Sequence, residues 1–92
     1  MDKNQAKEII REVTKHGCFM LSKHCRLRMS ERNVTMEDII HVLKWGEVLT
    51  IQETPYENNF KCKIKGKDFD DEDLTIHASI IEKKRTVIIT VY

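Results

Sequence analysis

The fold is decided within residues 35–52, TMEDIIHVLKWGEVLTIQ, because the spacing of the hydrophobic residues changes there. The first hydrophobic residues of this stretch repeat at the i, i+3, i+4 and i+7 positions of one helix face: Met36, Ile39, Ile40 and Leu43. After Gly46, Leu49 and Ile51 alternate with polar residues, as in a half-buried strand. We therefore predict a helix that ends at Gly46 and strands that follow it.

Two further helices are predicted before this stretch. The first covers about Lys3 to His16 and ends at Gly17, since glycine bears no steric penalty in the left-handed conformation just past a helix end. Its helical spacing is carried by Ala6, Ile9, Ile10 and Val13. The second covers roughly Lys23 to Arg32, because Ser22 can accept a backbone N–H at its start and Asn33 tolerates the left-handed conformation at its end.

Alternating residues predict strands in the rest of the chain, around 49–52, 60–65, 74–80 and 87–92. The acidic segment 68–73, DFDDED, is predicted to be a loop because its charges repel one another. The predicted fold is α+β, with three N-terminal helices packed on one face of a four-stranded antiparallel sheet. Cys18 to Leu21 is interpreted as a short buried link or strand. The expected core contains Ile10, Val13, Met29, Ile40, Leu43, Ile76, Ile89 and Val91.

Length and composition favour one soluble domain. Ninety-two residues are too few for two cores, and 40% hydrophobic with 34% charged residues is typical of a globular chain. No apolar run is long enough to cross a bilayer and the first residues do not resemble a signal peptide, so no membrane association and a cytoplasmic location are expected. The net charge of +1 is unevenly distributed along the sequence, because residues 1–35 carry +4 and residues 36–92 carry −3.

Neither a cofactor nor a metal site is expected. The chain has three cysteines, an odd number that cannot form a complete set of disulfides. We expect Cys18, Cys25 and Cys62 to be free thiols in a reducing cytoplasm. No CxxC or HxxxH motif is present, so a zinc site is not predicted. Cys25 is interpreted as a small core residue, and the three glycines are too far apart to form a phosphate-binding loop.

A basic stripe runs along the predicted second helix. His24, Arg28 and Arg32 recur every four residues, so their side chains lie on one helix face. Guanidinium groups can hold a phosphodiester, and histidine can move a proton near neutral pH, which together would suit RNA cleavage through the 2′-hydroxyl. The alternative is that the arginines are solvated, or paired with Glu31 or the acidic loop, and that His24 only packs near the helix start. Spacing alone favours that alternative.

A second basic row consists of Lys61, Lys63 and Lys65, which project from one face of a predicted strand. The row could follow an RNA backbone. Exposed lysines on a strand also prevent aggregation between sheet edges. The sequence supports the two interpretations equally.

Residues 22–35, SKHCRLRMSERNVT, together with Glu37-Asp38-Ile39 and the final VIITVY, resemble the bacterial domain-of-unknown-function family numbered 4258. That family has the pattern Ser-x-His-x-x-x-Arg-Met-x-x-Arg, followed by a strand that ends in Thr-x-Tyr. The matching residues here are His24, Arg28, Met29, Arg32, Thr90 and Tyr92. The resemblance covers about residues 19–92 of this single predicted domain and leaves residues 1–18 as an N-terminal helical addition.

The family is usually grouped with RelE/ParE-like toxins and related small ribonucleases. The resemblance therefore implies a RelE/ParE-like fold and a catalytic cleft lined by His24, Arg28, Arg32, Thr90 and Tyr92. The expected function is a metal-independent endoribonuclease toxin that acts on RNA, free or ribosome-bound, and is held by a cognate antitoxin. The alternative, from another class, is a non-catalytic module that uses the basic helix face to hold an acidic protein or a nucleic acid.

Overall fold

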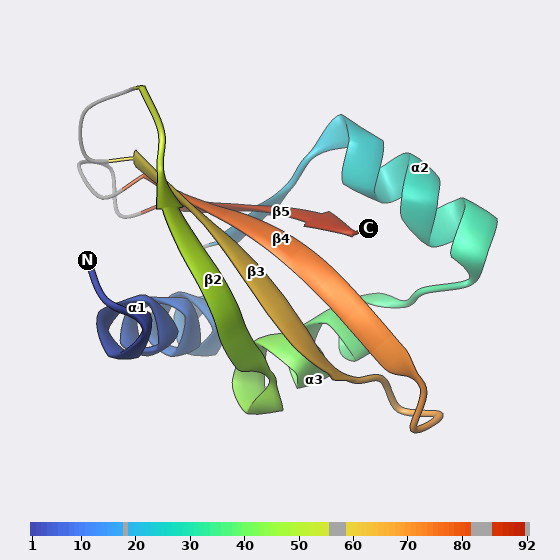
Figure 1. Ribbon diagram of the computed structural model, residues 1–92. Coiled ribbons are helices and arrows are strands. Elements are labelled where there is room, and N and C mark those ends of the chain that lie inside the picture. Colours follow the sequence, from blue (N-terminus) through green and yellow to red (C-terminus); the bar gives the residue numbers. More distant parts are fainter. Residues whose placement is uncertain (18, 56–58, 82–85, 92) are drawn as a thin grey trace.

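The computed structural model describes residues 1–17, 19–55, 59–81 and 86–91, which form an α+β fold (Figure 1). In chain order the elements are α1 (Lys3–His16), β1 (Phe19–Leu21), α2 (Lys23–Arg32), α3 (Met36–Trp45), β2 (Glu47–Glu53), β3 (Asn59–Lys67), β4 (Asp73–Ile81) and β5 (Thr86–Val91). None of the described helices combines the length and the apolar character that crossing a bilayer requires.

The sheet is mixed and has five strands in the order β1-β5-β4-β3-β2. β1 runs parallel to β5, and the other neighbouring strands are antiparallel. The predicted four-stranded antiparallel sheet is therefore wrong. The missing strand is β1, because its three residues are too few to show an alternating pattern and its partner lies at the other end of the sequence.

The three helices also do not share one face of the sheet, which corrects the predicted packing. α1 and α3 cover one face, whereas α2 lies beside β5 (Figure 1). The reason is the short first strand. β1 pairs only with Val87–Ile89, the chain leaves the sheet at Ser22, and α2 then lies against the remainder of β5. The opposite face of the sheet, which we call the open face, is not covered by α1 or α3.

The helices begin and end at the residues that the sequence predicts. The Ser22 side chain accepts the Cys25 N–H at 2.9 Å, and Thr35 starts α3 with a capping box. Gly17 and Asn33 adopt the left-handed conformation, with φ of 67° and 55°, and end the first two helices. Local capping chemistry therefore determines the helix boundaries.

The hydrophobic core lies between the covered face of the sheet and helices α1 and α3. Six of the predicted core residues are buried: Ile10, Val13, Leu43, Ile76, Ile89 and Val91. Met29 and Ile40, which were also predicted to be core residues, are less buried than expected and remain partly exposed. α3 is rotated relative to the expected stripe, because Ile39 and Val42 are fully buried whereas Met36 is 41% exposed.

A close approach between α3 and β3 explains this rotation. A Cβ atom on Gly46 would collide with the Val42 carbonyl oxygen, and one on Gly66 would lie 3.1 Å from the Cα of Gly46 and 3.3 Å from Cγ1 of Val42. Gly46 therefore needs glycine for space rather than for a positive φ, and a side chain on Gly66 would crowd the same contact. The contact seats Val42 over the sheet and turns Met36 outward.

An irregularity in β2 breaks the predicted alternation there. The register with β3 shifts between Val48 and Thr50, so Leu49 lies in a bulge. Val48 pairs with Ile64 and Ile51 pairs with Cys62 on the core side. The prediction that Leu49 and Ile51 lie on the same face of this strand in regular alternation is therefore wrong.

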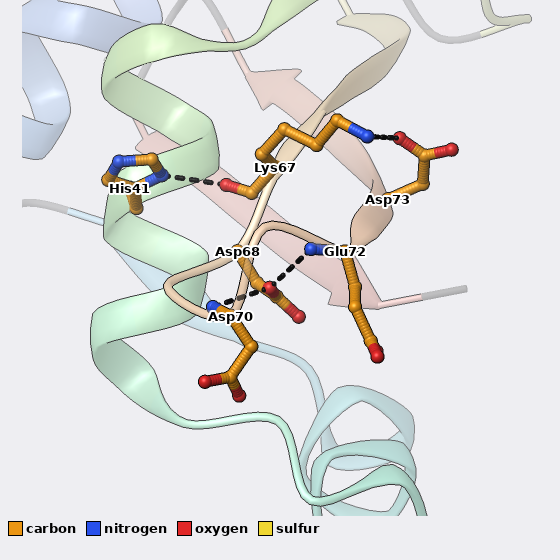
Figure 2. A network of polar contacts seen from close by, with 6 residues as sticks. All are labelled: His41, Lys67, Asp68, Asp70, Glu72 and Asp73. Atoms are coloured by element: carbon orange, nitrogen blue, oxygen red, sulfur yellow. Dashed lines mark hydrogen bonds and ion pairs between the residues drawn. The ribbon is translucent and has the colours of Figure 1, made fainter.

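The acidic segment forms the tight connection between β3 and β4 (Figure 2). One oxygen of Asp68, Oδ1, accepts the backbone N–H groups of Asp70 at 2.8 Å and Glu72 at 2.9 Å. Lys67 and Asp73 form an ion pair at 2.8 Å across the base of the connection. Asp73 belongs to β4, so the loop ends one residue earlier than predicted. These bonds offset the charge repulsion expected from the sequence.

We predict that Leu43→Ala lowers the free energy of unfolding by about 2–5 kcal/mol, because Leu43 is 3% exposed and its truncation leaves a cavity. Leu27→Ala is the matched control, since Leu27 is 57% exposed and the same atoms are removed from the surface. Urea denaturation of both variants gives the comparison. Equal losses in the two variants would contradict the observed placement of α3.

Candidate functional site

A hollow of about 330 Å³ lies between α2 and the open face of the sheet. One wall is the basic stripe predicted from the sequence, namely His24, Arg28 and Arg32 on α2. The other wall is formed by His77 from β4 and Thr90 from β5, together with Val91. The fold therefore brings a helix face and two strands from the far end of the chain to one place.

Ser22 fixes the position of α2 beside this hollow. Its backbone N–H donates to the Ile89 carbonyl oxygen at 3.0 Å, and its hydroxyl is hydrogen-bonded to that of Thr90, also at 3.0 Å. The same side chain caps the helix through Cys25 N–H. Cys25 is fully buried, so α2 is tied to the sheet both at its N-cap residue Ser22 and in its first turn.

The open face continues the site away from α2 as a row of polar side chains. Thr50, Lys63, His77 and Thr90 are register partners on four adjacent strands. Because neighbouring strands lie about 4.8 Å apart, Lys63 lies roughly 10 Å from Thr90. Lys61 and Lys65 flank Lys63 on the same strand and are exposed, as predicted for one face of β3. The three lysines thus extend the positive charge of the hollow across the sheet.

The environment of His77 disfavours its protonated form. Burial lowers the pKa of His77 below the ordinary value, and the positive charges of Lys63 and Lys61 lower it further. The side chain is half-buried on the open face, whereas its strand neighbours Ile76 and Ala78 point into the core. His77 is therefore a neutral imidazole at neutral pH, able to accept a proton.

His24 and Arg28 contact each other within the stripe. Arg28 Nε–H donates to His24 Nε2 at 3.3 Å, so that ring nitrogen carries a lone pair and the proton of neutral His24 lies on Nδ1. Among the described residues, no carboxylate forms an ion pair with Arg28. The alternative in which Arg28 is paired with Glu31 or the acidic loop is therefore wrong for this residue.

Only some of the predicted site residues line the hollow. His24, Arg28, Arg32 and Thr90 line the hollow, whereas Tyr92 lies outside the described residues. Lys61 lines a separate hollow near Ser79. The sequence analysis missed His77. The alternation around His77 predicted only a strand, and the place of His77 beside α2 depends on the register of β4 with β5, which the pattern does not determine.

Neither of the two described thiols, Cys25 and Cys62, lines the hollow. Burial raises the pKa of Cys25, and it raises that of Cys62 to about 11, so both are protonated core residues at neutral pH. Cys18 lies outside the described residues. Within the described residues no three His, Cys, Asp or Glu side chains are grouped in the way metal ligands are.

Comparison with known proteins gives one finding. Residues 21–92 match the sequence profile of a family described as "Domain of unknown function (DUF4258)". The match begins at the end of β1 and spans α2, α3 and β2 to β5, so it includes every element that lines the hollow. No curated protein and no solved structure matches the chain significantly.

We predict that His77 makes the fold sensitive to mild acid. Below about pH 6.5 the unfolded chain binds a proton on His77, but the folded protein binds it only at a lower pH. The free energy of unfolding therefore falls as the pH decreases from 7.5 to 5. Urea denaturation across this range should show a shallower fall for His77→Gln than for the unmodified chain. The same fall in both proteins would show that His77 titrates normally.

Proposed function

We propose that this chain, which belongs to the DUF4258 family, is a metal-independent endoribonuclease. In the cell it would act as a RelE/ParE-like toxin of a toxin–antitoxin module. The observation that carries the proposal is the juxtaposition in the hollow: His24, Arg28 and Arg32 face the hydroxyl and imidazole groups of the open face. A proton-transfer group and two cations around one cavity match the needs of phosphodiester cleavage.

The reaction would proceed by attack of the RNA 2′-hydroxyl on the adjacent phosphorus. The O2′–P bond forms, the P–O5′ bond breaks, and a 2′,3′-cyclic phosphate is left. His24 exchanges a proton with the 2′-hydroxyl or the leaving oxygen. Arg28 and Arg32 stabilise the negative charge that develops on the phosphorane. All of this chemistry is supplied by side chains.

The lysine row would hold the RNA on either side of the reacting phosphate. Lys61, Lys63 and Lys65 are exposed and lie on the same sheet face as the hollow. Cations spaced along a strand can follow a flexible sugar–phosphate backbone, because each contact releases a condensed counterion. In this role the open face binds RNA, free or ribosome-bound, and a cognate antitoxin would regulate the protein.

One observation favours the alternative function, a non-catalytic module for an acidic protein or a nucleic acid. The lone pair of His24 Nε2 is engaged by Arg28 at 3.3 Å. A histidine bonded in this way positions a guanidinium and transfers no proton until the bond breaks. The same surface would then bind an anionic partner without turnover.

Cleavage of RNA separates these functions. We expect the purified chain to cut RNA, offered both free and on translating ribosomes, with 2′,3′-cyclic phosphate ends. With free RNA the activity should be the same in EDTA. His24→Ala should lower the rate by about 10²–10⁴-fold, the usual contribution of a general acid or base. A substrate with a 2′-deoxy residue at the cut position is the control and should stay intact.

Binding is measured in parallel by fluorescence anisotropy. His24→Ala should retain RNA affinity while it loses turnover. RNA binding without cleavage in the unmodified chain, on both substrates, would contradict the ribonuclease and leave the binding module.

A further inference from the structure

Two imidazoles occupy opposite walls of the same hollow. His24 comes from α2, and His77 comes from β4, where it is the register partner of both Lys63 and Thr90. The sequence motif shared with the family contains only the first of them. His77 has no assigned role, yet its ring lies among the groups expected to hold the reacting phosphate.

RNA transesterification needs two proton transfers at opposite sides of the phosphorus. One proton leaves the 2′-hydroxyl as it attacks, and another must reach the 5′-oxygen as it departs. The attacking and leaving oxygens are roughly in line in such displacements. One side chain on one wall cannot serve both positions in a concerted step, whereas two imidazoles on facing walls can.

The charges around His77 select its role. The groups that face it are His24, Arg28 and Arg32 from α2 and Lys61 and Lys63 from β3, while Thr90 from β5 carries no charge. Burial and the lysines lower the pKa of His77, so the ring stays neutral. A neutral imidazole can accept a proton, and the negative charge of a bound phosphate stabilises the imidazolium that results.

His24 has the complementary arrangement. Its Nε2 accepts from Arg28 Nε, and that bond is lost once Nε2 carries a proton. A bound phosphate competes for the Arg28 guanidinium, because a bond between two ionised groups is stronger than the bond to neutral imidazole. His24 is exposed and can then take a proton from solvent and donate it to the leaving oxygen.

We propose that His77 is the general base and His24 the general acid of this site, an inference that rests on the proposed ribonuclease function. His77 removes the proton of the 2′-hydroxyl as the O2′–P bond forms. His24, as imidazolium, gives its proton to the 5′-oxygen as the P–O5′ bond breaks. Each ring ends in the protonation state of the other, and solvent exchange restores both.

The test uses the full chain and two substrates, RNA and a nucleoside 3′-(4-nitrophenyl phosphate), whose leaving group needs no proton. His77→Gln should lower kcat/KM about 100-fold or more on both substrates, and its rate should no longer fall at acidic pH. His24→Ala should lose a similar factor on RNA but retain activity within about tenfold on the nitrophenyl ester. Ser79→Ala, on the same face of β4 but outside the hollow, is the control and should match the unmodified chain.

The possible results distinguish a failure of the ribonuclease function from a failure of the roles given to the two histidines. An unmodified chain that cleaves neither RNA, whether free or on translating ribosomes, nor the nitrophenyl ester overturns both the ribonuclease and the roles of the histidines. A chain that cleaves RNA, with His77→Gln as active as the control, overturns only the role of His77. If His77→Gln melts below the assay temperature, the profile of His24→Ala on the nitrophenyl ester decides. The base assignment requires an acidic limb there, and a flat profile contradicts it.

Discussion

The parallel contact between β1 and β5 is the constraint on which the site depends. It is short, but it determines where the chain leaves the sheet, since Ser22 bonds to Ile89 through its backbone and to Thr90 through its hydroxyl. Ser22 then caps α2, a contribution of about 1 kcal/mol. With Cys25 buried one turn later, the direction of α2 is fixed, and its basic stripe lines the hollow beside the open face, where His24 and Arg32 remain exposed to solvent.

Charge separation gives this arrangement its chemical character. Part of the chain's positive charge lies around the hollow and along the open face, on Arg28, Arg32 and the lysine row. The acidic connection between β3 and β4 bonds to itself (Figure 2). Asp38 of α3 accepts the Phe69 N–H, and its pKa is lowered by that bond and, more strongly, by the N–H of Thr35. The hollow therefore keeps a positive potential that an anionic ligand can use.

Sequence patterns predicted the parts of the fold that depend on local chemistry. The bounds of α1 and α2 follow from caps such as Gly17, Ser22 and Asn33, and the faces of β3 and β4 follow from alternation. The features that the sequence patterns did not predict depend on tertiary contacts. Parallel pairing of three residues, the bulge at Leu49 and the packing of Gly46 against Gly66 leave no periodic signal. The basic stripe was predicted because its members share one helix, whereas His77 joins it only through strand register.

The central claim is that the face of α2 turned toward the open sheet binds RNA, and two charge reversals on this one helix test it most directly. Arg28 lines the hollow, whereas Arg26 lines a groove on the other side of α2, so Arg28→Glu and Arg26→Glu change the net charge equally. RNA affinity is measured for both variants at several salt concentrations. The account predicts that Arg28→Glu weakens binding more and reduces the salt slope by about 0.7, one phosphate contact to single-stranded RNA. Equal effects of the two substitutions, or a larger effect of Arg26→Glu, would contradict it.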